Sequence, residues 1–156
     1  AGDECHVFDE IELDTSNTTQ MAEEIRRRYP NRYVIICPDP SGKSRKTSAP
    51  VGQTDFTILE SVGFEVRAPL AAPAVVDRVN NSNAMYLADG RRRTLIHPRC
   101  VKLIRALRNL QYKVGTSVRD KGSGFDHICD ALDYLIWEEF NVLEDIGGMT
   151  VGHVSM

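Results

Sequence analysis

The chain has 156 residues, of which 42% are hydrophobic and 26% are charged, and its formal net charge is −3. This composition is typical of one soluble domain with one core and excludes a fibrous or disordered chain. No apolar run is long enough to span a membrane, and the first residues lack the basic and apolar regions of a secretory signal, so we expect an intracellular protein.

Predicted strands and helices alternate along the chain. Alternating apolar residues predict a strand at 4–13, and a continuous apolar run predicts a strand at 33–37 that is buried on both faces. Two more short strands are predicted at 64–68 and 93–97. Cap residues and apolar residues at helical spacing predict helices at about 17–30, 54–63, 75–87, 98–110 and 125–140. This order indicates an α/β domain with a largely parallel or mixed sheet.

The charged residues are separated along the sequence. Residues 1–24 contain eight acids and no Lys or Arg, residues 122–156 contain seven acids and no Lys or Arg, and all 19 bases lie in 25–121. That middle segment carries a formal charge of +12. Such a distribution favours a surface that binds a polyanion, although basic runs on helices are also typical of solvated faces.

The first candidate site is Asp39, which follows the predicted strand at 33–37 and stands between two prolines. Functional groups of open α/β sheets gather at the carboxyl ends of strands, so Asp39 is a candidate metal ligand. An ordinary Asp-Pro turn is the alternative interpretation. A polar loop follows, and three of its bases are candidate contacts for phosphate oxygens: Lys43, Arg45 and Lys46.

The second candidate site is the start of the last predicted helix. Asp126, His127 and Asp130 are separated by three or four residues and can project from neighbouring positions on one helix face. Carboxylates at a helix N-terminus are also favoured by the helix dipole. Two acids and a histidine nevertheless suit Mg²⁺ or Mn²⁺, with the histidine as outer ligand or proton shuttle. We expect Asp133, further along the helix, to be a surface acid.

Several segments carry a resemblance to a known family: 38–42, 53–56 with 63–64, 77–80 with Asn83, and the D-H-I-C-D-A-L-D-Y sequence at 126–134. Together they resemble the C-terminal nuclease domain of the large terminase subunit of tailed bacteriophages over about residues 7–140. The last segment is the most specific. The resemblance implies an RNase H-like domain at 1–143, with a mixed central sheet flanked by helices, and a flexible tail at 144–156.

The resemblance also implies a function and a site. Asp39 and Asp130 would be the catalytic carboxylates, assisted by His127. With Asp126 they would hold two Mg²⁺ or Mn²⁺ ions, and phosphates of double-stranded DNA would contact Lys43, Arg45, Lys46 and Arg78. The implied activity is cutting of concatemeric viral DNA during genome packaging, in the cytoplasm of the infected bacterial host. The implied partners are the terminase ATPase domain, the small terminase subunit and the portal, with no membrane.

The chain differs from the family at its N-terminal end. The family takes its first metal-binding Asp from an initial strand that precedes the strand at 4–13, and we expect that strand to be missing here. Asp9 or Glu10 on the adjacent strand are candidates to approach the site. Two alternatives stay open: a non-catalytic DNA-binding or assembly module, which would not depend on a divalent ion, and another RNase H-like nuclease such as a resolvase, which would require a particular DNA end or branch.

Overall fold

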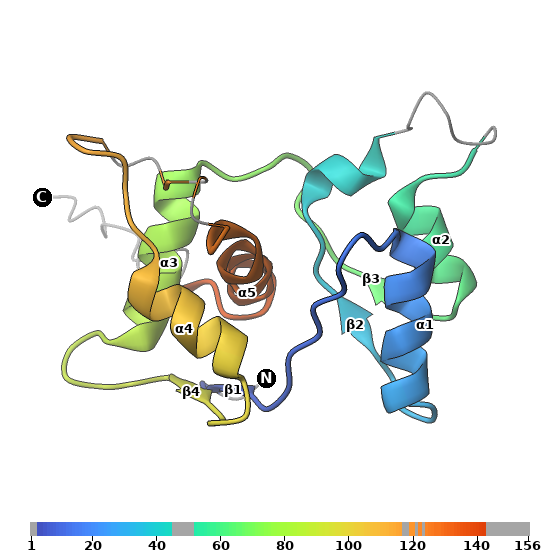
Figure 1. Cartoon of the computed structure of the whole chain (residues 1–156), viewed down its shortest axis with the longest axis horizontal. Coiled ribbons are helices and arrows are strands. Elements are labelled where there is room, and N and C mark those ends of the chain that lie inside the picture. The colour runs from blue at the N-terminus through green and yellow to red at the C-terminus, as the bar shows by residue number, and fades with distance from the viewer. Residues whose placement is uncertain (1–2, 45–51, 117–118, 121, 123, 143–156) are drawn as a thin grey trace, which may run out of the picture.

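The computed structural model describes residues 3–44, 52–116, 119–120, 122 and 124–142. Helices and strands alternate over this range, as the sequence predicts (Figure 1). The elements in chain order are β1 (Cys5–Val7), α1 (Thr18–Arg28), β2 (Ile35–Ile36), the 3₁₀ helix η1 (Pro40–Lys43), α2 (Asp55–Ser61), β3 (Glu65–Val66), α3 (Val75–Tyr86), β4 (Thr94–Ile96), α4 (Val101–Asn109) and α5 (Asp126–Glu139). The predicted tail at 144–156 lies outside the described residues.

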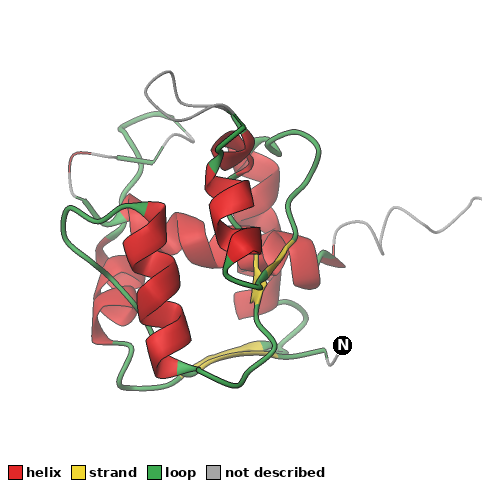
Figure 2. Cartoon of the chain, turned by 90° about the vertical axis from the view of Figure 1, so that its right-hand side faces the viewer, coloured by secondary structure: helices red, strands yellow, loops and turns green. Residues whose placement is uncertain are grey.

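The described strands form two small parallel sheets and not the single mixed sheet that we expected. In one sheet β1 pairs with β4, with Cys5 opposite Thr94, and in the other β2 pairs with β3, with Ile35 opposite Glu65. Figure 2 shows the helices around these two strand pairs. β2 is half-buried and not covered on both faces as expected, and it is also shorter, because only two of the five residues at 33–37 pair with a neighbouring strand.

Two separate clusters of buried hydrophobic side chains replace the single core that the composition suggested. The smaller one packs Ala22 of α1 and Leu59 of α2 against Phe64, next to β2 and β3. The larger one joins β1, α3, α4 and α5 and comprises Cys5, Met85, Cys100, Leu103, Leu132 and Ile136. We call the part built from α1, β2, η1, α2 and β3 the first lobe, and the part built from β1, α3, β4, α4 and α5 the second lobe (Figure 1).

Polar contacts connect the two lobes. Arg67, just after β3, donates a hydrogen bond of 2.8 Å from Nη1 to Oε1 of Glu139 at the end of α5. Asp9, in the segment between β1 and α1, accepts from the Tyr29 hydroxyl at 2.5 Å and from Nη1 of Arg28 at 3.1 Å. Nη2 of Arg99, in the second lobe, also lies 3.9 Å from Oδ1 of Asp9. The relative position of the lobes therefore depends on ion pairs and hydrogen bonds.

The helix starts follow the cap residues of the sequence. Asn17 accepts from the Gln20 backbone N–H at 2.9 Å while the Gln20 side chain accepts from Asn17 at 3.0 Å, which completes a capping box before α1. Thr54 and Thr57 make the equivalent pair before α2. That helix ends at Gly63, whose positive φ of 86° suits a residue without Cβ. No helix within the described ranges is both long and apolar enough to cross a membrane.

Glu10 caps a helix from a distance. Its Oε1 accepts from the Lys102 backbone N–H at 3.0 Å, and its Oε2 accepts from the Leu103 N–H at 2.8 Å. The residue that directly precedes α4, Cys100, makes no side-chain cap of its own. Asp9 and Glu10 are therefore engaged in structural contacts that tie the start of the chain to Tyr29 and to α4.

Replacing Glu10 with Ala should lower the free energy of unfolding by about 1–2 kcal/mol, because the first turn of α4 loses a charged acceptor for two backbone N–H groups. Urea unfolding followed by circular dichroism measures the change. Glu12→Ala is the matched control, because Glu12 makes only an exposed ion pair with Lys102 and should cost less than about 0.5 kcal/mol. Equal effects of the two substitutions would contradict the capping role.

Candidate functional site

Asp39 lies where the sequence predicts, just beyond the carboxyl end of β2. It is the cap residue of η1, and its Oδ1 accepts a hydrogen bond of 2.8 Å from the Ser41 backbone N–H. The flanking prolines restrict the backbone on both sides, and Pro40 has no N–H that would compete for the carboxylate. The side chain is exposed and keeps a fixed orientation.

The surroundings of Asp39 favour its ionised form. Burial opposes ionisation, but hydrogen bonds from Ser41 and from the Tyr134 hydroxyl, together with the charge of Arg78, lower the pKa of the Asp39 carboxyl below its ordinary value. Tyr134 responds in the opposite sense, since burial and the nearby Asp39 raise the pKa of its hydroxyl. Asp39 of the first lobe is thus coupled to residues of α3 and α5 in the second lobe.

One face of α5 carries three acids at intervals of four and three residues: Asp126, Asp130 and Asp133. Asp130 is partly accessible, with 30% of its side chain exposed. Asp133 is only 1% exposed, so our expectation of a surface acid is wrong. The apolar neighbours Leu132 and Tyr134 suggested exposure of Asp133, but its spacing from Asp130 places it on the same face, where a buried cation pairs with it.

That buried cation is Arg119. Its guanidinium donates from Nη1 to Oδ1 of Asp130 at 2.7 Å and from Nη2 to Oδ2 of Asp133 at 2.6 Å. Burial raises the pKa of the Asp133 carboxyl although Arg119 opposes this shift. Burial likewise opposes the charged form of Arg119, but the two carboxylates outweigh it and raise the pKa of the guanidinium. The buried carboxylate of Asp133 and the guanidinium of Arg119 therefore stabilise each other in the folded protein.

Arg78 is the second cation that contacts Asp130. It comes from α3, is only 4% exposed, and donates from Nη2 to Oδ1 of Asp130 at 3.0 Å. Its guanidinium carbon lies 4.0 Å from the centre of the Tyr134 ring, which is the geometry of a cation–π contact. From the sequence we expected Arg78 to contact DNA phosphates. In the structure this side chain is buried against an acid and an aromatic ring.

The candidate site is the place where these groups converge. Asp39 of the first lobe accepts a hydrogen bond from Tyr134 and is influenced by the charge of Arg78, and Arg78 and Arg119 contact Asp130 in the second lobe. Both sequence-predicted carboxylates therefore belong to one polar network, although 91 positions separate them in the sequence. Arg119, Asp133 and Tyr134 are members that the sequence analysis did not predict.

The other predicted residues lie in different situations. His127 is exposed and makes no hydrogen bond or ion pair with the residues that the structure describes. Asp126 is 2% exposed, and its Oδ1 has no hydrogen-bond partner within the described ranges. Lys43 is exposed at the end of η1, and the two remaining predicted phosphate contacts lie outside the described residues: Arg45 and Lys46.

The site fits a divalent ion only in part. In the part of the chain that the structure describes, no three His, Cys, Asp or Glu side chains are close enough together to form a metal cluster. Mg²⁺, however, commonly binds one or two carboxylates and completes its shell with water and substrate phosphate. Asp39 and Asp130 have accessible carboxylates of the type that such an ion binds, whereas the unpartnered Oδ1 of Asp126 is buried.

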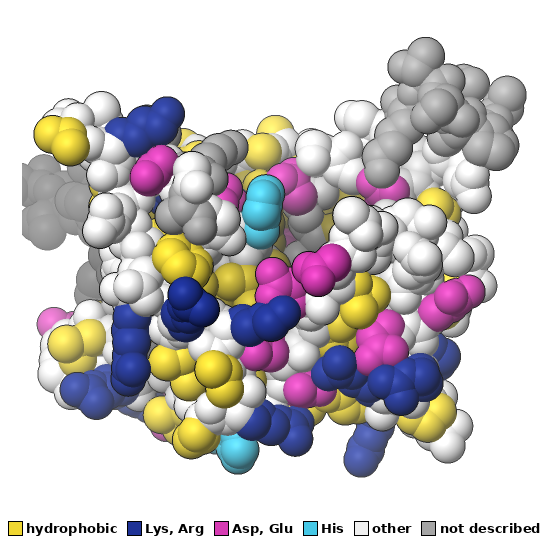
Figure 3. Space-filling model, viewed as in Figure 1, with side chains coloured by type: hydrophobic (Ala, Val, Ile, Leu, Met, Phe, Trp, Pro, Cys, Tyr) yellow, Lys and Arg dark blue, Asp and Glu magenta, His cyan; other side chains and the backbone are white. Residues whose placement is uncertain are grey.

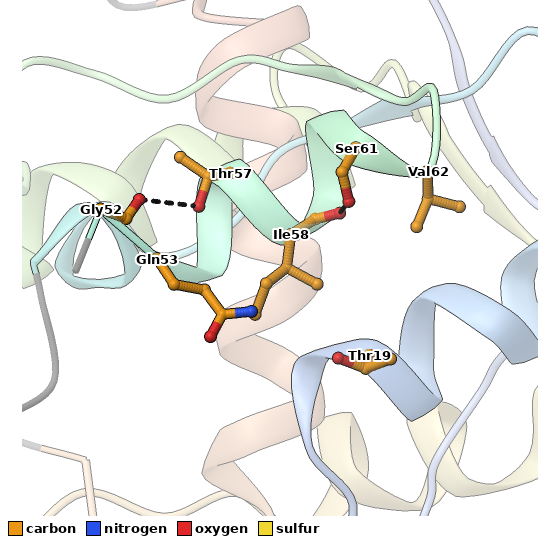
Figure 4. A pocket seen from close by; sticks show the side chains of 7 residues that line it. All are labelled: Thr19, Gly52, Gln53, Thr57, Ile58, Ser61 and Val62. Carbon is orange, nitrogen blue, oxygen red and sulfur yellow. Dashed lines mark hydrogen bonds between the residues drawn. The ribbon is translucent and has the colours of Figure 1, made fainter. Parts of the chain in front are cut away.

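A pocket elsewhere in the first lobe contains none of the predicted site residues. It lies between α1 and α2 and is lined by Thr19, Gly52, Gln53, Thr57, Ile58, Ser61 and Val62 (Figure 4). Thr57 and Ser61 turn their hydroxyls to backbone oxygens of their own helix region. The lining is neutral, so this pocket offers no charged group for catalysis.

Comparison with known proteins adds a family. The family model of the terminase RNaseH-like domain matches residues 1–139. The chain belongs to this family. No curated protein and no solved structure matches the chain significantly. The match confirms the sequence resemblance and the RNase H-like fold class, and it identifies this terminase domain as a nuclease-like module of DNA packaging.

Asp133→Asn should lower the free energy of unfolding of the terminase domain by about 3 kcal/mol, because it leaves the buried Arg119 with one carboxylate in place of two. Thermal and urea unfolding measure the loss. Asp3→Asn is the matched control, since Asp3 pairs with Arg91 on the surface and should cost less than about 1 kcal/mol. A loss at Asp133 no larger than the control would show that the buried pair is not needed for stability.

Proposed function

We propose that this terminase domain is a metal-dependent endonuclease that cuts concatemeric double-stranded viral DNA during packaging. The observation that carries the proposal is the convergence of Asp39 and Asp130 on Arg78 and Tyr134 at the junction of the lobes. Carboxylates from a strand end and from a helix face, brought together at an accessible place, suit phosphodiester hydrolysis with divalent ions. The family match agrees with this chemistry at the coarser level of a nuclease-like domain.

Asp39 and Asp130 would hold Mg²⁺ or Mn²⁺, with Asp126 as a further oxygen donor. Two such ions, when bound, would activate a water molecule and stabilise the leaving 3′-oxygen. The remaining water ligands and a DNA phosphate would complete the shell, as is usual for Mg²⁺. Asp126 has a buried oxygen without a partner, which is the reason to include it.

The residues around the carboxylates orient them. The Ser41 N–H fixes Oδ1 of Asp39, and the Tyr134 hydroxyl supports the same side chain. On Asp130, both guanidinium groups contact Oδ1, so Oδ2 is the atom available for a ligand. His127 precedes Asp130 by three residues on α5 and is exposed, which suits a group that moves a proton to or from bulk water.

DNA would bind through exposed bases without reading the base sequence. Figure 3 shows Lys and Arg side chains over α4 and around the C-terminal end of α1. Lys102, Arg105 and Arg108 are exposed on α4. Lys43 is exposed beside Asp39, and Arg45 and Lys46 follow it in the sequence. Point charges of this kind bind phosphates, and no base-reading motif accompanies them.

The wider setting of the proposal follows from family membership. The domain would act beside the terminase ATPase domain, with the small terminase subunit and the portal as further partners, in the cytoplasm of the infected bacterial host.

One observation favours a second candidate, a non-catalytic DNA-binding or assembly module. Asp130 and Asp133 are neutralised by Arg78 and Arg119, so the acids of α5 also have a purely structural explanation. Such a module would bind DNA equally well with and without a divalent ion. Metal dependence of cleavage therefore separates the two functions.

Asp39→Asn should abolish metal-dependent nicking of supercoiled plasmid, because it removes the charge of a metal ligand and keeps its size. Asp130→Asn should do the same, and His127→Ala should slow nicking by only about 10- to 100-fold, because water replaces a proton shuttle in part. Conversion of supercoiled plasmid to nicked and linear forms is measured with Mn²⁺, with Mg²⁺ and with a chelator.

Asp89→Asn serves as the control for these exchanges, because Asp89 occupies an exposed turn with a positive φ that Asn also adopts. Circular dichroism confirms that each variant is folded. Nicking that persists in chelator, or an Asp39→Asn variant that cuts as fast as the parent, would exclude the two-metal nuclease and favour the binding module.

Removing the charges of Lys43, Arg45 and Lys46 by Ala substitution should weaken DNA binding and make it less sensitive to salt. Each lost phosphate contact lowers the slope of log affinity against log salt by about 0.9. Fluorescence anisotropy with a labelled duplex at several NaCl concentrations measures this slope. The matched control replaces Arg91, Arg92 and Arg93, which changes the net charge equally. Equal slopes for the parent and the first variant would show that residues 43–46 do not contact DNA.

A further inference from the structure

A cation already occupies the surroundings of the two predicted metal ligands. The guanidinium of Arg78 contacts Oδ1 of Asp130 and the ring of Tyr134, and its charge acts on Asp39. We propose that Arg78 is an internal counter-ion that competes with a divalent cation for this site, so that metal binding requires Arg78 to move away from Asp130. This inference rests on the proposed metal-dependent function and adds a regulation of the same site.

The contacts of Arg78 are weaker than those of Arg119. Arg119 donates to two carboxylates at 2.7 and 2.6 Å, whereas Arg78 donates to one carboxylate at 3.0 Å. Among the described residues, Nε and Nη1 of Arg78 are buried without a hydrogen-bond partner, whereas Arg119 has one such atom, its Nε. A buried donor without a partner is costly. Of the two guanidinium groups that contact Asp130, that of Arg78 is therefore the one that is displaced more easily.

The arrangement on Asp130 allows this exchange without loss of the site. Arg119 alone can keep Oδ1 of Asp130 in position, since Arg119 is itself held by an ion pair with Asp133. Arg78 retains a place over the Tyr134 ring after it leaves Asp130, because the cation–π contact does not depend on the carboxylate. A divalent ion on Asp130 would repel the neighbouring guanidinium. Binding of the ion and retreat of Arg78 are thus coupled.

The test measures Mn²⁺ affinity of the folded chain by isothermal titration calorimetry, without DNA and without cleavage. Arg78→Met removes the competing charge and keeps a long side chain beside Tyr134, so it should bind Mn²⁺ about tenfold more tightly than the parent. Arg78→Lys keeps the charge, although it loses the planar stacking on Tyr134, and should gain much less affinity than Arg78→Met. Arg92→Gln, a charge removal at an exposed position before β4, should leave the affinity within about twofold of the parent.

A second measurement follows Arg78 itself. In a ¹⁵N NMR spectrum, the Nε–Hε signal of Arg78 should shift on addition of Mg²⁺, and the corresponding signal of Arg119 should shift much less. The Arg78 signal is assigned as the one that is missing from the spectrum of Arg78→Met. This readout does not depend on DNA cleavage and also serves if the Met variant is less stable than the parent.

The outcomes separate this inference from the proposed function. Tighter Mn²⁺ binding by Arg78→Met, with Arg92→Gln near the parent and a much smaller gain for Arg78→Lys, supports the competition. Binding by the parent that Arg78→Met leaves unchanged or weakens overturns the competition alone and makes Arg78 a positioning residue. If neither the parent nor Arg78→Met binds Mn²⁺ while both are folded, the proposed metal-dependent function fails and the inference fails with it.

Discussion

Asp133 of α5 lies in the interior with the guanidinium group of Arg119 against it, and Asp130, on the same helix face, contacts both Arg119 and Arg78. An isolated buried carboxylate would be far too costly, and a buried guanidinium without a carboxylate would be equally so. Arg119 resolves both problems for Asp133 and also reaches Asp130. Arg78 connects α3 to the same helix face. The packing of α3, α5 and the segment that carries Arg119 therefore depends on charge pairing as well as on the hydrophobic cluster around Ile136.

This pairing has a consequence for the site, because the two lobes have separate hydrophobic cores. Asp39 belongs to the lobe built around Phe64, and Asp130 belongs to the lobe built around Ile136. The lobes meet through polar groups such as Arg67 with Glu139. Polar contacts weaken with salt and are less rigid than a shared core. The separation of the two carboxylates therefore depends on polar contacts between the lobes and not on a shared hydrophobic core.

The sequence predicts the parts of the fold that depend on local interactions. The capping residues Asn17 and Thr54 mark the starts of their helices, and the position of Asp39 after a strand is confirmed. The sequence does not predict which distant strands and side chains contact one another. The periodicity of apolar residues does not predict that the strands form two sheets. The identity of a basic residue such as Arg78 does not indicate whether it contacts DNA or an acid inside the protein. The spacing of Asp130 and Asp133, three residues apart on one helix, is a signal that could have placed Asp133 on the same face as Asp130.

Internal pairing also changes the meaning of the charge distribution. The basic middle of the sequence carries a formal +12, but many of its bases already contact acids from the two ends. Arg28 pairs with Glu24, Lys102 pairs with Glu12, and Arg119 pairs with Asp133. The bases that keep no carboxylate partner within the described residues include Lys43, Arg105 and Arg108. Because only such bases release counterions on binding to DNA, the electrostatic attraction is set by this smaller group and by its position, and the acidic ends mainly stabilise the fold.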